Sequence, residues 1–178
     1  MQQPRPTSSN LLQRLADWHD GLTKAGFALA TFFVGVIAAS FVYEVIARYV
    51  FDAPTFWSYA VGEYVLCATI FLSVPELTRR GAHININLIS DRLAPEQARR
   101  LRLFIGLLAA GACFVAAWIA GTESWRQCVQ DVTTLTSFPI PKWWVSIFIP
   151  YGFLSSAIHF LRQLGHDVRQ AIPIGAGP

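Results

Sequence analysis

The chain has 178 residues, of which 53% are hydrophobic and only 14% are charged. A soluble domain carries about 25% charged residues, and 13 Phe and 6 Trp are more aromatic surface than a soluble shell of this size would hide. The net charge of +3 comes from Lys and Arg in short stretches between long apolar runs, whereas a nucleic-acid binder gathers them on one folded face. Composition therefore argues against an ordinary soluble domain and a nucleic-acid partner, and it predicts a chain solvated by membrane lipid.

A short amphipathic segment precedes the first apolar run. Leu11, Leu15, Trp18 and Leu22 recur at intervals of four, three and four residues, which places them on one helical face. We expect this short helix to lie along the membrane surface. The apolar run that follows is too long for the hydrophobic region of a cleaved signal peptide, so we expect it to be retained.

Four apolar runs are each long enough to cross a bilayer, because a core about 30 Å thick needs roughly 20 apolar residues in a helix. The bilayer offers no water to backbone groups, so each run is predicted to be helical. The predicted spans are 25–47, 56–78, 101–122 and 143–162. The predicted fold is an all-α membrane protein in which residues 1–178 form a single integral membrane domain, with residues 1–10 and 170–178 flexible.

Basic residues in the connections set the predicted orientation, because cytoplasmic loops carry an excess of Lys and Arg. One side of the membrane collects 11 of the 14 basic residues, and the other side holds only Arg48, Arg126 and Lys142. Both termini and the central loop are therefore predicted to be cytoplasmic. The short loops around Asp52 and Asp131 are predicted to be periplasmic.

A few polar and helix-breaking residues interrupt the spans. Glu63 is the one carboxylate clearly inside a span, roughly 10 Å from its outer end, and such an acid is a functional candidate by default. We favour a structural pairing with Arg48, and a contact with a partner subunit and the handling of an ion or proton are the alternatives. Glu44 and Arg48, four residues apart, are also predicted to pair. Pro150 and Gly152 predict a kink about halfway along the fourth span.

Small residues recur every four positions in the third span. They form two neighbouring ridges, which comprise Ala109, Cys113, Ala117 and Gly121, and Ala112, Ala116 and Ala120. Ridges of this kind let helix backbones approach closely in lipid. We favour packing among the chain's own four helices, and a site for a partner helix is the alternative.

No pattern of residues indicates catalysis or a bound cofactor. The sequence contains no P-loop, HExxH or GxSxG motif. His83 and His159 are expected near the cytoplasmic face, where haem ligands are unusual, and His19 and His166 are flanked by charged residues and expected to be solvated. The three cysteines show no CxxC spacing. We therefore predict no enzymatic activity, no metal site and no cofactor.

Two sets of short motifs carry a family resemblance. The first set comprises Trp57, Phe71, Leu72, Arg80, Gly81, His83, Ile84, Ile86 and Asn87. The second comprises Pro139, Pro141, Lys142, Trp143, Trp144, Pro150 and Gly152. Over roughly residues 25–165 the chain resembles the small membrane subunit (the DctQ-like small permease component) of a tripartite ATP-independent periplasmic (TRAP) transporter. It departs at Tyr59 and Ala60, where the family often has an acidic pair.

The resemblance implies a scaffold role in a sodium-coupled transporter for organic acids such as dicarboxylates, in the bacterial inner membrane. A periplasmic substrate-binding protein would deliver the acid to a large membrane subunit, and this chain would brace that subunit and help dock the binding protein. No substrate site is then expected in this chain. The candidates for structural or subunit contacts are Trp57, Glu63, Arg80, Gly81, His83, Pro141 and Pro150.

The loop after the second span carries the most detailed expectations. Gly81 is expected to end the helix as a C-cap residue. Residues 84–93 would then stay at the membrane interface until Pro95 starts the next helix. His83 is interpreted as a hydrogen-bonding brace to a helix end or to the large subunit, and a solvated loop histidine is the alternative. Contacts with lipid headgroups are expected from Arg99, Arg100 and Arg102.

Three other functions stay open from the sequence. An independent transporter or channel, working as a small homo-oligomer, would need polar residues along a path through the spans, and Glu63 alone offers little. A cytochrome-like electron carrier would need haem ligands. An assembly or sensory protein would have a partner unrelated to transport.

Overall fold

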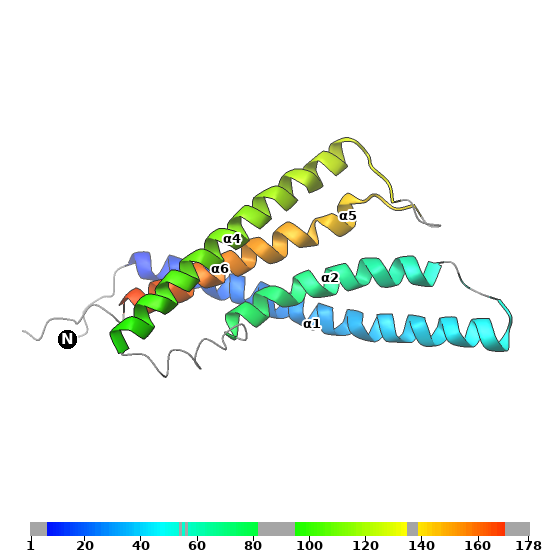
Figure 1. Cartoon of the computed structure of the whole chain (residues 1–178), viewed down its shortest axis with the longest axis horizontal. Coiled ribbons are helices and arrows are strands. Elements are labelled where there is room, and N and C mark those ends of the chain that lie inside the picture. Colours follow the sequence, from blue (N-terminus) through cyan, green and yellow to red (C-terminus); the bar gives the residue numbers. More distant parts are fainter. Residues whose placement is uncertain (1–6, 54, 56, 82–94, 135–138, 170–178) are drawn as a thin grey trace, which may run out of the picture.

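The computed structural model describes residues 7–53, 55, 57–81, 95–134 and 139–169. These residues form helices and one isolated β-bridge (Figure 1). The helices are α1 (Thr7–Val50), α2 (Trp57–Arg79), α4 (Pro95–Val129), α5 (Trp143–Ser146) and α6 (Phe148–Arg169). Four stretches are long and apolar enough to cross a membrane: Gln13–Val50, Trp57–Arg79, Glu96–Val129 and Trp143–Gly165. The predicted all-α class with four membrane helices is confirmed.

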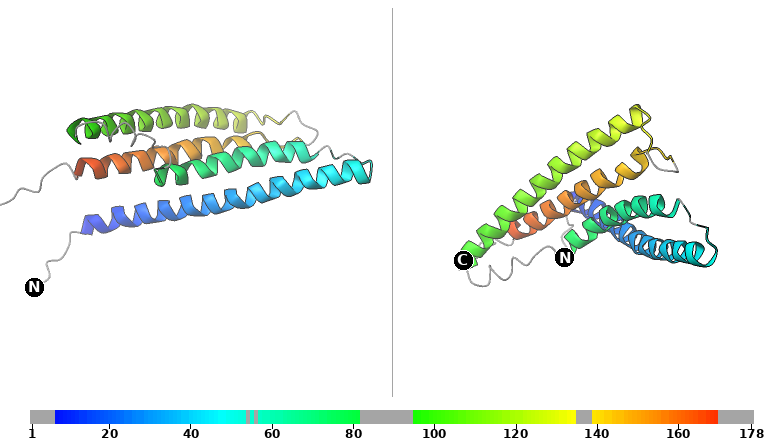
Figure 2. Two further views of the ribbon diagram at one scale, coloured as in Figure 1. Left: turned by 60° about the horizontal axis from the view of Figure 1, so that its bottom comes forward. Right: turned by 45° about the vertical axis from the view of Figure 1, so that its right-hand side comes forward.

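The long helices form an open row rather than a closed bundle (Figure 2). Helix α1 packs against α2, α2 packs against α6, and α6 packs against α4. Helices α1 and α4 therefore lie at the two edges of the row, and these edge helices bury little of their surface. In the most apolar stretch of each helix, 6% of residues are buried in α1 and 11% in α4, against 39% in α2 and 28% in the α5–α6 segment.

The two ends of the row differ in the number of arginines that they carry. At one end α1 and α4 begin and α2 and α6 end (Figure 1), and we call it the arginine-rich end because Arg79, Arg80, Arg99, Arg100 and Arg162 lie there. At the opposite end, which we call the turn end, the chain reverses direction between α1 and α2 and between α4 and α5. This alternation is what four consecutive membrane crossings require.

Helix α1 is longer than a bilayer is thick. Its 44 residues span about 66 Å at 1.5 Å per residue, roughly twice the hydrocarbon thickness. The predicted amphipathic segment at residues 11–22 is the first part of this continuous helix, and a separate surface helix is not confirmed. Leu15, Trp18 and Leu22 are all exposed. The first turns of α1 run past the end of α2 and lie against α6, where side chains join the two helices.

The turns at the turn end are closed by residues with positive φ. Asp52 has φ 50° and Asp131 has φ 48°, a conformation that Asp tolerates better than most residues. After α4 the chain forms a short antiparallel bridge between Thr133 and Pro141, and Lys142 donates its N–H to the carbonyl of Val132 at 2.9 Å. This bridge brings the chain back to α5.

The fourth membrane segment is interrupted near the turn end. Ile147 separates α5 from α6, and Pro150 is the third residue of α6. Proline has no N–H to donate to the carbonyl four residues earlier, which is that of Ser146, so a regular helix cannot continue through this turn. The helix is thus interrupted at Ile147, near the start of the span rather than halfway along it, and a kink of the helix axis stays a prediction.

Small residues bring neighbouring helices together. Gly152 packs so closely against α2 that an added Cβ would lie 2.6 Å from the carbonyl oxygen of Phe71. On α4, Ala117 is 8% exposed, and a Cβ at Gly121 would contact the ring of Pro150 at 3.8 Å. The ridge that contains these two α4 residues thus faces α6. In the neighbouring ridge Ala112 is exposed.

Candidate functional site

Polar side chains gather in clusters toward the two ends of the helices. At the arginine-rich end, Glu76 is 1% exposed and accepts hydrogen bonds from two consecutive arginines. Arg79 donates from Nε and Nη2 at 2.7 and 2.6 Å, and Arg80 donates from Nε at 2.8 Å. Hydrogen bonds from charged groups satisfy a buried carboxylate that would otherwise be costly to bury.

This cluster also holds the end of α2 against its neighbours. The guanidinium of Arg80 lies 5.2 Å from the centre of the Phe27 ring on α1, a cation–π contact. Gln163 of α6 donates from Nε2 to the carbonyl of Thr78 at 2.9 Å. Gly81 then ends the helical turn with φ 68°, as expected for a C-cap glycine. Glu76 is not among the residues predicted from the sequence, although its spacing of three and four residues from the two arginines is a usable signal.

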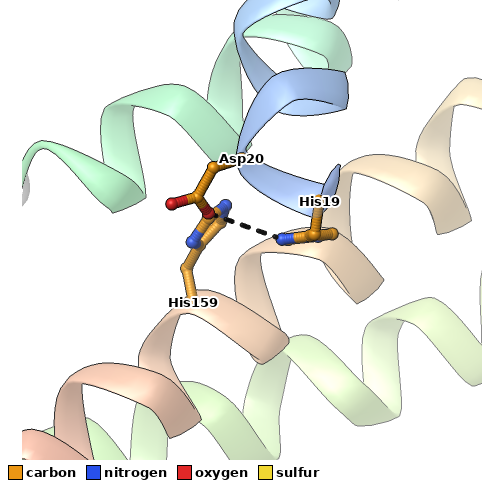
Figure 3. Close-up of side chains that lie close together, drawn as sticks. All are labelled: His19, Asp20 and His159. Carbon is orange, nitrogen blue, oxygen red and sulfur yellow. Dashed lines mark ion pairs between the residues drawn. The ribbon is translucent and has the colours of Figure 1, made fainter. Parts of the chain in front are cut away.

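A second cluster joins α1 to α6. His19 Nε2 lies 2.9 Å from Ser155 Oγ, Thr23 Oγ1 lies 3.2 Å from His159 Nε2, and Asp20 pairs with Arg162. The imidazole rings of His19 and His159 are 4.6 Å apart between centroids. The expectation that His19 is solvated is wrong: its side chain is 17% exposed, because α6 covers it. Figure 3 shows His19 and Asp20 on α1 and His159 rising from α6 toward them.

At the turn end, Glu44 is the centre of a third cluster. It is 4% exposed and accepts from Arg48 at 2.7 Å, from the Thr55 N–H at 3.2 Å and from Ser58 Oγ at 2.8 Å. The predicted Glu44–Arg48 pair is confirmed. The favoured pairing of Arg48 with Glu63 is wrong, because Arg48 pairs instead with Glu44, which lies one turn away on the same helix.

Glu63 lies on α2 with its side chain exposed on the helix surface. Among the residues that the structure describes, none forms a hydrogen bond or an ion pair with its carboxylate. Such an acid inside an apolar segment calls for a partner outside this chain or for a path to the headgroup region. Its contact with a partner subunit therefore stays a prediction.

A fourth cluster fixes the turn between α4 and α5. Gln127 is 5% exposed and accepts at Oε1 from the hydroxyl of Ser146 at 2.7 Å. Its Nε2 donates to Glu123 at 3.0 Å, and Glu123 pairs with Arg126 at 2.7 Å. This arrangement holds the last turn of α4 against α5 at the turn end.

The remaining predicted residues are placed as follows. Trp57 is 43% exposed, with its ring centre 6.1 Å from that of Tyr43 on α1. Pro141 belongs to the bridge that leads into α5. Arg100 and Arg102 are exposed near the start of α4, and Arg100 pairs with Glu96 at 3.3 Å. Arg99 is partly buried there, and its Nε has no hydrogen-bond partner among the described residues. His83 and the predicted interfacial segment lie outside the described residues.

The hydroxyl of Ser155, the imidazole of His19 and the carboxylate of Asp20 lie next to one another. The same three groups, in the same sequence of contacts, make up a Ser-His-Asp catalytic triad. Ser155 is 4% exposed, and the distance from His19 Nδ1 to Asp20 Oδ1 is 4.0 Å, too long for the hydrogen bond that orients the base. Three surface grooves of about 410, 630 and 470 Å³ have mostly apolar linings that do not include Ser155. This arrangement joins two helices, with the Ser155 hydroxyl buried between them.

The fold defines a helical protein whose apolar helices can cross a membrane four times. Residues 37–170 match the family described as the DctQ component of the tripartite ATP-independent periplasmic transporters. This match covers three quarters of the chain, which therefore belongs to that family and is a small TRAP transporter component. A comparison with curated proteins finds no match.

Proposed function

We propose that the chain is the scaffold subunit of a sodium-coupled TRAP transporter that takes up organic acids such as dicarboxylates. It braces the large transport subunit and helps to dock the periplasmic substrate-binding protein. It resides in the bacterial inner membrane with both termini in the cytoplasm. Family membership supports the transporter context, and the arrangement of the helices supports the scaffold role.

The observation that carries the scaffold role is the open row of helices. The edge helices α1 and α4 bury 6% and 11% of the residues in their apolar stretches. Exposed large side chains extend along both of them, among them Phe32, Val42, Phe104 and Trp118. In a membrane such surfaces contact lipid or other helices, and association there depends on close packing rather than on a hydrophobic driving force. A row of this shape offers two long edges against which a larger subunit can pack.

The placement of polar groups also favours a scaffold over an independent transporter. A transport path needs polar groups along the middle of the spans, and ionisable residues there mark such paths. In the described part of this chain, the buried carboxylates Glu44 and Glu76 are engaged by arginines and hydroxyls of the chain itself. Glu63 is the one exposed acid in the middle of a described span. One acid on a helix surface does not line a path.

The predicted contact residues fit this proposal in two groups. Trp57, Pro141 and Pro150 shape the turn end, which would face the periplasm and the binding protein. Arg80 and Gly81 shape the arginine-rich end, next to which His83 would act as a brace. Arg99, Arg100 and Arg102 would contact lipid headgroups at the start of α4.

Co-purification and uptake test the proposal together. The chain would be co-expressed with a large TRAP membrane subunit from the same organism, purified through a tag on this chain, and reconstituted with a periplasmic binding protein of the same system. We expect a stable two-subunit complex and sodium-dependent uptake of an organic acid that requires both membrane subunits. Sodium-driven uptake by this chain alone would contradict the scaffold role and favour a homo-oligomeric transporter.

A further inference from the structure

His19, Asp20 and His159 form a compact group of metal-ligand types. Each offers one ligand atom, and these atoms all lie within 4.8 Å of one another (Figure 3). Two of the residues are adjacent on α1, and the third is on α6. Two imidazoles and one carboxylate are a donor set that binds Zn²⁺ and related divalent ions in proteins.

Hydrogen bonds around His159 fix its protonation in a form suited to a ligand. The Thr23 hydroxyl donates to the carbonyl of His19 at 2.9 Å, so its proton is already used. Thr23 Oγ1 must therefore accept from His159 Nε2 at 3.2 Å. In the neutral ring the proton is then on Nε2 and the lone pair on Nδ1. Ligating histidines characteristically donate their other ring N–H in this way.

The ring of His19 supplies an independent indication. Its Nδ1 is enclosed and has no hydrogen-bond partner among the described residues. The nearest acid oxygen, Asp20 Oδ1, is 4.0 Å away, beyond hydrogen-bond distance. An enclosed polar atom without a partner is destabilising. A cation placed between this nitrogen and the carboxylate would give both atoms a partner.

The ligand atoms of His19, Asp20 and His159 could surround a small divalent cation after modest movement of their side chains. Zinc bonds of about 2.0–2.1 Å in a tetrahedron bring ligand atoms to roughly 3.3 Å from one another. Arg162 pairs with Asp20, and a carboxylate has enough lone pairs to accept an arginine and bind a metal at once. The Arg162 side chain is 34% exposed, so its charge can also turn toward solvent.

We propose that His19, Asp20 and His159 bind a divalent transition-metal ion of the Zn²⁺ type, which ties the first turns of α1 to α6. His19 and Asp20 precede the charge-free run 25–43 of α1, and the Asp20 side chain is 26% exposed. A metal ion can therefore reach the site from the aqueous side. The sequence predicted no metal site because the two histidines are separated by 140 positions.

Zinc titration of the full chain tests this site. The protein, purified in detergent micelles through a tag without histidines and stripped with a chelator, should bind one Zn²⁺ per chain at micromolar concentration. A variant in which Cys67, Cys113 and Cys128 are replaced by Ser should bind equally well. His19→Gln and His159→Gln should each weaken binding at least about tenfold, whereas His166→Gln should not.

Two further measurements separate loss of the site from loss of the fold. X-ray absorption of the wild-type zinc complex should show nitrogen or oxygen ligands at about 2.0–2.1 Å and no sulfur at about 2.3 Å. Zinc should raise the melting temperature of the wild-type protein but not that of His19→Gln. Sulfur ligation, unchanged zinc affinity in both histidine variants, or no zinc uptake by the wild-type chain would each overturn the proposal.

Discussion

Two glutamates are buried at opposite ends of the helices, and each is held by an arginine on its own helix. Glu44 pairs with Arg48 near the turn end, and Glu76 pairs with Arg79 and Arg80 at the arginine-rich end. Their arginines are partly exposed, from 30% for Arg79 to 60% for Arg80. The carboxylates are thus removed from lipid while the positive charges reach water or headgroups.

Replacing Glu76 with Gln should destabilise the protein. The substitution removes three charge-assisted hydrogen bonds and leaves two arginines without their acid, which should lower the free energy of unfolding by about 1.5–3 kcal/mol. Thermal unfolding in micelles measures the effect. Glu96→Gln is the matched control, because the Glu96–Arg100 pair is exposed and contributes less than about 1 kcal/mol. Equal melting temperatures for the two variants would show that the Glu76 cluster does not stabilise the fold.

Replacing Glu63 with Leu should weaken the complex with the large subunit and leave the chain itself folded. Glu63 is exposed on α2 and has no partner among the described residues, so its loss removes no bond that the structure shows within the chain. A hydrogen bond to a charged group contributes about 1.5–3 kcal/mol, so the affinity for the large subunit should fall at least about tenfold. Quantitative co-purification provides the measurement, with Glu96→Gln again as control. Wild-type recovery of the complex would exclude a subunit contact at Glu63.

The residues that sequence reasoning placed correctly are those whose partners are close along the chain. Glu44 and Arg48 are one helical turn apart, and Gly81 follows directly after the helix that it ends. The pairing of Arg48 with Glu63 was wrong because several acids compete for one arginine, and helix geometry decides among them. The contact between His19 and Ser155 joins residues 136 positions apart, and no local pattern predicts which faces of α1 and α6 meet.

At the scale of helices, the contact between α2 and α6 depends on Gly152. A Cβ at this position would lie 2.6 Å from the carbonyl oxygen of Phe71 and 3.1 Å from its Cβ. A backbone atom cannot turn away as a side chain can, so Gly152→Ala must push the two helices apart. The four spans were predictable from apolar length, whereas the open row was not, because it depends on which small residues face a neighbour.

Gly152→Ala should therefore destabilise the protein by about 1–3 kcal/mol, the usual cost of overpacking a close contact. Gly35→Ala on α1 is the matched control, since a Cβ there meets no atom within 4 Å. Alanine is favoured over glycine inside a helix by up to about 1 kcal/mol, so this control should be neutral or stabilising. Melting temperatures in micelles compare the two variants. A Gly152→Ala protein as stable as Gly35→Ala would contradict the proposed close packing.

At the scale of the whole molecule, the geometry brings the helix ends together in two groups, and the distribution of Lys and Arg between these groups predicts the orientation. The starts of α1 and α4 and the ends of α2 and α6 lie at one end of the row, as four successive crossings require (Figure 1). This end carries the clustered arginines, including Arg79, Arg80, Arg99 and Arg100. The turn end carries Arg48, Arg126 and Lys142, of which the first two are paired with acids on their own helices.

Reporter fusions should place the arginine-rich end in the cytoplasm, because an excess of Lys and Arg keeps short loops on that side of the membrane. Fusions near Arg100 and Arg169 should be fluorescent with a reporter that matures only in the cytoplasm. Fusions near Asp52 and Asp131 should be active with an enzyme that folds only in the periplasm. Each site serves as its own control, because the two reporters must give opposite signals there. A periplasmic signal at Arg100 would reverse the orientation, and it would move the Glu76 cluster and the proposed metal site to the outer face of the membrane.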